Sequence, residues 1–183
     1  MPACERLAEL SHIAPAEVER IICGSDLEER FTRGEIDGQE FTSGVNNTLE
    51  LALSPEQLRE IWIEAYEENL PVSRIIHQLR PNHGLVLLSN INRWHADCVM
   101  GRFEILRLFN DAVFSYQSGF VKPEEGIFKE AMSTAGSESQ VLFVDDKPEY
   151  VKAACKLGMT GIVYEGSGQL RESLVRLGCR LST

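Results

Sequence analysis

An uninterrupted apolar run that leads directly into two acids limits the possible folds of this chain more than any other feature. Val141 to Val144 carry only apolar side chains, and Asp145 and Asp146 follow at once. Such a run is typical of a strand buried on both faces of a parallel sheet, and these sheets bind ligands at the carboxyl ends of their strands. Adjacent carboxylates repel each other unless a cation lies beside them. The run therefore predicts a metal or phosphate site, or alternatively a solvated acid pair in which Asp146 caps a helix beginning near Pro148.

The second half of the chain alternates between short apolar runs and helical patterns. Besides the run at 141–144, strands are expected at 85–88, 112–114 and 161–164. Helices are expected at 93–101, 124–135, 148–157 and 168–177, and a polar loop at 116–121. Strands that alternate with helices of about ten residues indicate a parallel sheet. We therefore expect an α/β fold with a Rossmann-like, three-layer architecture.

The first half of the chain shows helical signals and no strand. Ser54, Pro55 and Gln57 form the clearest helix start, with a cap, a proline in the first turn and a capping-box partner. Further helix starts are expected near Pro15, Asp26, Asp37 and Pro71. Leu58, Ile61, Trp62 and Ala65 give the helix after Ser54 one apolar face. The face of Trp62 and Tyr66 is interpreted as core rather than as a ligand site. We expect a helical subdomain at 1–70 and an α/β core at 71–183.

Composition excludes several classes of protein. The formal net charge is −10, which argues against nonspecific nucleic-acid binding. No segment has the pattern of a membrane span or a signal peptide, and the glycine motifs of dinucleotide-binding and P-loop proteins are absent. The five cysteines are odd in number and show no CxxC spacing, so reduced thiols in a cytoplasmic protein are expected. The four histidines, at 12, 77, 83 and 95, show no metal-ligand spacing.

Polar groups of a consistent kind follow three of the expected strands. Ser89 and Asn90 offer a hydroxyl and a backbone amide ahead of a helix, which suits a phosphate oxygen. Lys122 offers a positive charge, and Asp145 and Asp146 offer the hard oxygen ligands that Mg²⁺ prefers. Singly, Ser89–Asn90 is also explained as a helix cap and Lys122 as a solvated loop residue. Together these residues predict a site for phosphate and magnesium.

At this point the chain resembles the haloacid dehalogenase-like (HAD) hydrolases, a superfamily dominated by phosphatases. The segments 87–92, 115–123 and 142–149 look like the second, third and fourth motifs of the superfamily, in the right order. The helical front half, notably 29–36, is similar to the small cap of the subgroup that contains glucose-1-phosphate phosphatase and the N-terminal domain of soluble epoxide hydrolase. The resemblance covers nearly the whole chain.

The resemblance implies a magnesium-dependent phosphatase of small phosphorylated metabolites, of the sugar-phosphate type. Ser89 and Asn90 would bind the phosphoryl group, and Lys122 would neutralise it and hold the geometry of the nucleophile. Asp146 matches the residue that ligates magnesium, and Asp145 would be a secondary ligand. The cap would close over the substrate and set its choice.

The chain departs from the family pattern at two places. The first motif of the family is an apolar strand followed by Asp-x-Asp, whose first Asp is the nucleophile, and only residues 1–3 precede the cap here. Tyr150 stands where the family often has Asn. Two explanations stay open: a shortened version of a normal enzyme, or a non-catalytic pseudoenzyme that binds phospho-ligands or proteins. In the family's strand order the absent strand is the central one, so we expect an unfilled slot between the strands at 85–88 and 141–144.

Overall fold

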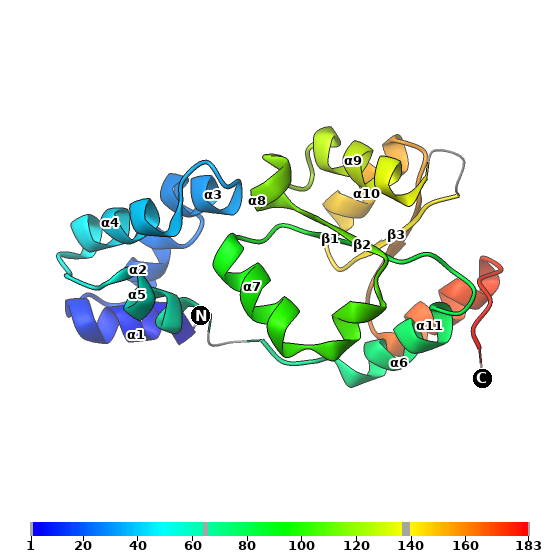
Figure 1. Ribbon diagram of the computed structural model, residues 1–183, viewed down its shortest axis with the longest axis horizontal. Helices are drawn as coiled ribbons and strands as arrows, with labels where there is room; N and C mark the ends of the chain where they lie inside the picture. Colours follow the sequence, from blue (N-terminus) through cyan, green and yellow to red (C-terminus); the bar gives the residue numbers. More distant parts are fainter. Residues whose placement is uncertain (1, 64–65, 137–139, 183) are drawn as a thin grey trace. The chain divides into compact units, whose positions relative to one another are not determined.

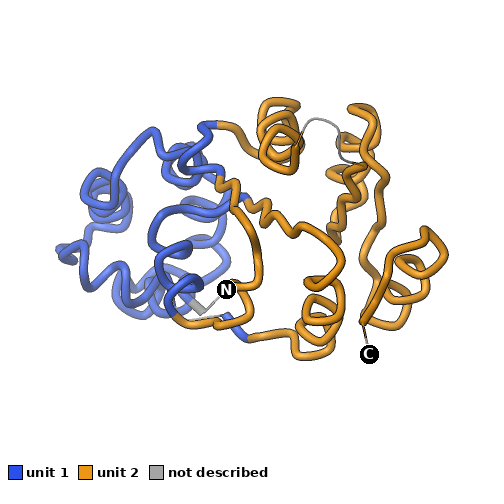
Figure 2. The backbone as a smooth tube through the Cα atoms, turned by 45° about the vertical axis from the view of Figure 1, so that its right-hand side comes forward, with its two compact units in different colours: residues 1–67, 90–101, 115–119 blue, residues 68–89, 102–114, 120–183 orange. Residues whose placement is uncertain are grey.

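The computed structural model describes residues 2–63, 66–136 and 140–182, and they form two compact units (Figures 1 and 2). Unit 1 contains residues 1–67, 90–101 and 115–119, and unit 2 contains residues 68–89, 102–114 and 120–183. Two later segments of the chain thus join the helical front half, whereas the sequence suggested a single boundary near residue 70. Ala65, expected on the apolar face of a helix, lies outside the described residues.

Unit 1 is helical throughout its described elements. It contains α1 (Pro2–Ser11), α2 (Pro15–Ile22), α3 (Asp26–Thr32), α4 (Gly38–Leu49), α5 (Pro55–Trp62), most of α7 (Arg93–Arg102) and α8 (Ser115–Ser118). The helix starts predicted at Asp37 and Ser54 are confirmed, and both form complete capping boxes. The helix expected near Asp26 begins there, but Asp26 is not its cap as predicted, because Ser25 accepts the hydrogen bond from the Glu28 amide. The expected loop at 116–121 is also partly wrong, since α8 occupies its start.

Aromatic side chains fill the centre of unit 1. The rings of Phe31 and Phe41 stack with their centroids 4.4 Å apart, and the edge of Trp94 meets Phe31 at 4.9 Å. Trp62 packs edge-on against Phe41 at 5.0 Å and is 4% exposed, in agreement with its predicted core position. A β-carbon added at Gly38 would lie 2.5 Å from the Trp94 ring, so this glycine permits the close approach of the ring.

Unit 2 contains all the described strands, and they pair in parallel as the sequence predicted. Its elements are α6 (Leu70–Leu79), β1 (Val86–Ser89), the 3₁₀ helix η1 (Glu104–Leu108), β2 (Asp111–Phe114), α9 (Glu125–Ala135), β3 (Leu142–Asp145), α10 (Pro148–Lys156), β4 (Thr160–Val163) and α11 (Ser167–Arg176). β1 pairs with β2 and β3 pairs with β4, both in parallel. The four strands form two separate two-stranded sheets rather than one.

Helices cover both faces of the strands in unit 2, with α9 and α10 above the strands and α6 and α11 below them in Figure 1. On one face, Phe128 of α9 and Val151 of α10 pack in a cluster with Val113 of β2 and Phe143 of β3. On the other face, Ile75 of α6 and Leu174 of α11 join a cluster with β4. The resulting helix–sheet–helix layering is the three-layer α/β architecture predicted from the sequence.

β1 and β3 each have one edge without a strand partner among the described residues. Successive residues of a strand direct their backbone groups to opposite edges. Leu85 and Asp145 point their carbonyl oxygens towards the partner strands, with hydrogen bonds of 2.8 Å from Asn110 and Tyr164. The backbone groups of Val86 and Leu88, and those of Leu142 and Val144, therefore face away from the partners.

The open edges also change the burial of the strands. We expected the run at 141–144 to be buried on both faces, but only Phe143 of β3 is fully buried, and all four residues of β1 are half-exposed. That expectation is wrong because a strand with one unpaired edge has no neighbour to cover its side. Among the described strands, β1 and β3 do not pair with each other, and the unfilled slot between them stays a prediction.

Candidate phosphate site at the strand ends

Lys122 lies at the carboxyl ends of β1 and β3. Its Nζ donates a hydrogen bond of 2.6 Å to Asp145 Oδ2 and one of 3.3 Å to the carbonyl oxygen of Leu88. Leu88 directly precedes Ser89, and its carbonyl is one of the groups that face away from β2. The ammonium group therefore links the unpaired edge of one sheet to the last residue of a strand in the other. Two of the predicted polar residues, Lys122 and Asp145, thus contact each other in unit 2, and Lys122 also contacts the residue that precedes Ser89.

Burial and neighbouring rings reinforce the Lys122–Asp145 pair. Each of the two side chains is 9% exposed. Nζ of Lys122 also lies 5.8 Å from the ring centre of Phe143 and 5.2 Å from that of Tyr150. Both distances fall within the range in which an aromatic face attracts a cation. Screening by water is weak here, so removing either partner would leave the other charge buried without compensation.

The acid pair is positioned differently from a simple helix cap. Oδ1 of Asp145 accepts a hydrogen bond of 2.9 Å from the Lys147 amide, just before α10. Asp146 is exposed, and the N-terminal residue that precedes α10 is Lys147, with no side-chain cap. The alternative in which Asp146 caps this helix is therefore wrong. Asp145 is the last residue of β3 and is mostly buried, whereas Asp146 lies in the bend after the strand and is exposed.

The residues expected to bind phosphate after β1 fall in two units. Ser89 ends β1 in unit 2, and Asn90 begins the next segment of unit 1. The explanation of Ser89–Asn90 as a helix cap is wrong for α7, because Asn92 Oδ1 accepts the hydrogen bond of 3.1 Å from the His95 amide. The hydroxyl of Ser89 is thus not used to cap α7.

Tyr150 and Lys147 were missed as site residues by the sequence reasoning. Nζ of Lys147 lies 5.0 Å from the Tyr150 ring centre and donates a 3.4 Å hydrogen bond to its hydroxyl. This hydrogen bond raises the pKa of Lys147 above its ordinary value. Tyr150 thereby lies between two lysines. The spacing of three residues between Lys147 and Tyr150, at the start of a helix, is the signal that predicts such a pair.

The resemblance to the HAD-like hydrolases implies a magnesium ion near Asp145 and Asp146. Both carboxylate oxygens of Asp145 already accept hydrogen bonds, from Lys122 and from the Lys147 amide. Within the described part of the chain, no three His, Cys, Asp or Glu side chains lie close enough together to hold a metal ion. Magnesium prefers six oxygen ligands in near-ideal octahedral positions. The described residues therefore do not form a complete magnesium site, and magnesium binding by Asp145 and Asp146 stays a prediction.

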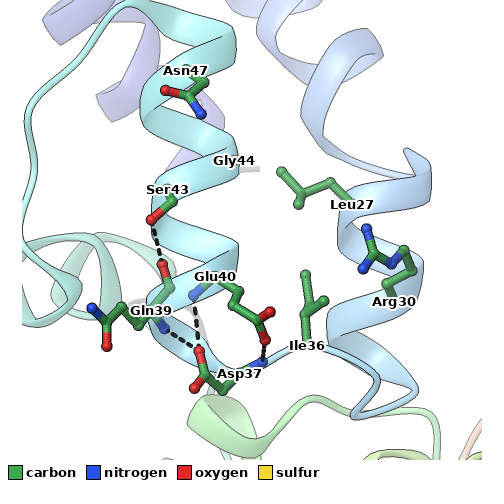
Figure 3. Close-up of a pocket in the computed structure, with 9 residues that line it drawn as sticks. All are labelled: Leu27, Arg30, Ile36, Asp37, Gln39, Glu40, Ser43, Gly44 and Asn47. Atoms are coloured by element: carbon green, nitrogen blue, oxygen red, sulfur yellow. Dashed lines mark hydrogen bonds between the residues drawn. The ribbon is translucent and has the colours of Figure 1, made fainter.

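Unit 1 has two surface hollows of its own. One, of about 490 Å³, lies between α3 and α4 and is lined by the residues drawn in Figure 3. Several of its polar groups already bond to one another, as in the capping box of Asp37 and Glu40 (Figure 3). The other, of about 550 Å³, is lined by residues 34–38 and by Arg93, Trp94 and Tyr116. Arg93 offers hydrogen-bond donors to the second hollow, and the Tyr116 hydroxyl can donate or accept a hydrogen bond.

Ser115, which directly precedes Tyr116 of the second hollow, joins three segments of unit 1. Its side chain is fully buried, and Oγ accepts a hydrogen bond of 2.8 Å from the Ile91 amide. The same hydroxyl oxygen lies 2.8 Å from the carbonyl oxygen of Thr32 and 3.1 Å from that of Ile91. A single buried hydroxyl thus joins α3, the segment before α7 and the start of α8.

The helix–sheet–helix layering, the parallel strands and the polar strand ends define the Rossmann-like α/β fold of the HAD-like hydrolases, and the chain has this fold. No family model matches the sequence. Solved structures do match it, over most of its length. A predicted HAD-like family hydrolase from Porphyromonas gingivalis is 25% identical, with a TM-score of 0.80, and the match covers 96% of this chain and 88% of that one.

A HAD family enzyme from Bacteroides thetaiotaomicron is also similar. Its wild-type complex with magnesium and inorganic phosphate is 23% identical, with a TM-score of 0.75, and the match covers 90% of this chain and 85% of that one. Its magnesium complex is 22% identical, with a TM-score of 0.78, over 93% of this chain and 89% of that one. These likenesses establish the fold. None of the helices described for this chain is long and apolar enough to cross a membrane.

Proposed function

We propose that this chain is a member of the HAD superfamily, related to magnesium-dependent phosphatases that act on small phosphorylated metabolites of the sugar-phosphate type. The fold supports this proposal, as do the complexes of a similar enzyme with magnesium and inorganic phosphate. The subgroup, with a helical cap that sets substrate choice, is proposed from the sequence of the front half.

The observation that carries the proposal is the position of Lys122. Its ammonium group contacts the backbone of β1 next to Ser89 and the carboxylate at the end of β3. A phosphate that reached this place would meet a buried cation and a hydroxyl, which together favour an anion with several oxygen acceptors. We propose that Ser89 and Asn90 bind the phosphoryl oxygens and that Lys122 neutralises their charge. Asp146, with Asp145 as a secondary ligand, is the position proposed for magnesium.

A specific observation favours a second candidate, in which this chain binds a phospho-ligand without hydrolysing it. Covalent phosphoryl transfer needs a nucleophile at the site. Among the described strands, β1 ends at Ser89, β2 at Phe114 and β4 at Val163, and only β3 ends at an acid. That acid, Asp145, is paired with Lys122 and hydrogen-bonded to the Lys147 amide. A site that binds phosphate but lacks a nucleophile would bind an anion and retain it.

Two measurements on the 183-residue chain test the proposal. We expect the chain to hydrolyse p-nitrophenyl phosphate in the presence of magnesium no faster than the Asp146→Ala variant, because the only acid that ends a described strand is Asp145, which is paired with Lys122. We also expect inorganic phosphate to bind, as measured by calorimetry, and the binding to be lost in Lys122→Met but kept in Lys129→Met, whose lysine is exposed on α9.

The possible outcomes separate the two candidates. A magnesium-dependent rate that Asp146→Ala abolishes would establish catalysis and reject the binding-only candidate. Phosphate binding without hydrolysis would support the binding-only candidate. A chain that neither binds phosphate nor hydrolyses the ester, while its circular dichroism shows a folded protein, would overturn both.

A further inference from the structure

Two cysteine side chains meet in the core of unit 1. Cys4 lies on α1 and is 2% exposed, and Cys23 follows the last turn of α2 and is half-buried. Their Sγ atoms lie 2.7 Å apart, although 19 residues separate them in the chain. Both are free thiols in the structure. A disulfide bond is about 2.05 Å long, so the sulfurs need to approach by less than about 1 Å to form one.

The packing of the two helices holds this pair in place. Cys4, Leu7 and Ala8 of α1 belong to the same buried cluster as Val18 and Ile22 of α2. Because this apolar core fixes both backbones, it holds the two cysteines within reach of each other. The other three cysteines, Cys98, Cys155 and Cys179, take part in no such contact among the described residues.

We propose that Cys4 and Cys23 are a redox-active pair that forms an intramolecular disulfide and so fastens α1 to α2. The oxidant is a low-molecular-weight disulfide, such as oxidised glutathione. The Cys23 sulfur, which is the more exposed, attacks one sulfur of the oxidant and releases one thiol. The Cys4 sulfur then attacks the Cys23 sulfur of the mixed disulfide and releases a second thiol. Two cysteine thiols are oxidised, one small disulfide is reduced, and the two protons end on the released thiols.

The surroundings of Cys23 affect the rate of this reaction. Burial raises the pKa of the Cys23 thiol, and the contact with Cys4 and the nearby carboxylates of Glu28 and Glu19 raise it further. The thiolate is the attacking species, so oxidation is slow at neutral pH. The resulting disulfide would be shielded from reductants by the same burial. The pair is therefore suited to a long-lived cross-link rather than to rapid exchange.

Peptide mapping of the wild-type chain is the direct test. The protein is incubated with oxidised glutathione at mildly alkaline pH, its remaining thiols are alkylated, and it is digested with trypsin. Cleavage after Arg6, Arg20 and Arg30 places Cys4 in peptide 1–6 and Cys23 in peptide 21–30. We expect these two peptides to be linked by a disulfide bond. The undigested protein should remain a monomer and should have lost the mass of two hydrogen atoms. Alkylation should then label three of the five cysteines.

Thermal unfolding adds a second readout with matched variants. Closing a loop of about 20 residues in a chain of this size should raise the melting temperature by about 5–10 °C, and a reductant should reverse the rise. Cys23→Ser should lose both the cross-link and the rise. Cys155→Ser, at an exposed position on α10, should keep both.

Two results would overturn the proposal. One is a wild-type chain in which Cys155 has become a glutathione mixed disulfide while peptides 1–6 and 21–30 remain unlinked. The other is a link between these peptides that occurs only in covalent dimers, which a non-reducing gel would reveal. Mapping requires no variant, so a folding defect in Cys23→Ser would not affect either result.

Discussion

Replacing Lys122 with methionine tests the central interaction of the candidate site. Methionine retains most of the aliphatic stem but removes the charge that contacts Asp145 at 2.6 Å. The Asp145 carboxylate, 9% exposed, would keep the hydrogen bond from the Lys147 amide and lose its cation. Removing one partner of a buried ion pair costs about 3–5 kcal/mol, because the other charge stays buried without compensation.

The loss is large enough to measure as a change in global stability. For a chain of this length, a change of 1 kcal/mol shifts the melting temperature by about 2–4 °C. Lys122→Met should therefore lower the melting temperature by about 6–20 °C. Urea unfolding followed by far-ultraviolet circular dichroism, at low protein concentration, gives the free energy of unfolding directly.

A neighbouring lysine provides the matched control. Lys129 forms a 2.8 Å ion pair with Glu125 on α9, but the two side chains are 64% and 69% exposed. Water and salt screen such a pair, so Lys129→Met should cost less than about 1 kcal/mol. In the double variant Lys122→Met/Asp145→Leu no charge remains buried, and much of the lost stability should return. A Lys122→Met variant as stable as Lys129→Met would refute the reasoning.

Three further predictions concern metal binding, pH and association. Magnesium should bind the chain with a dissociation constant in the millimolar range or weaker, which is a binding free energy of roughly 4 kcal/mol or less. The reason is that the described residues do not form a complete octahedral set of ligands. Micromolar affinity in calorimetry would contradict this prediction. Burial lowers the pKa of His95, whose Nε2 lies 2.8 Å from the Trp62 carbonyl oxygen. The unfolded chain then binds more protons than the folded one as the pH falls below 6.5, so stability should decrease as the pH is lowered from there. His95→Gln should flatten this part of the profile, and an unchanged profile would count against the prediction. The unpaired edges of β1 and β3 should make the isolated chain marginally stable and prone to aggregate; a monodisperse sample with a cooperative thermal transition would show otherwise.

Local signals in the sequence were sufficient to locate most elements. The capping boxes at Asp37 and Ser54 depend on side chains only three residues apart, so the pattern alone predicts them. The strands at Val86–Ser89 and Leu142–Asp145 follow from continuous apolar runs, and their parallel pairing follows from the helices between them. Errors arose where two neighbouring residues are equally suited to one role, as with Ser25 and Asp26 at the start of α3.

The sequence also predicted the residue types of the candidate site, because a hydroxyl, a lysine and adjacent acids after strands are unusual together. The sequence did not show which of the distant residues contact each other. The Lys122–Asp145 ion pair joins residues 23 apart, and the Cys4–Cys23 contact joins residues 19 apart. The sequence predicted reduced, scattered cysteines because no short motif brings these two together.

Only the tertiary structure determined which backbone edges stay open and which side chains fill the space between them. Burial of a strand depends on its neighbours on both sides, and an apolar run gives no information about how many neighbours it has. Leu88 therefore belongs to an apolar run that is typical of a buried strand. Its carbonyl oxygen nevertheless accepts a hydrogen bond from Lys122 rather than from another strand. The sequence by itself determined the type of most elements, though not of α8 or η1, and the residue types at the strand ends, since both depend mainly on local chemistry. The contacts across the chain required the fold, because they arise only when distant segments are packed together.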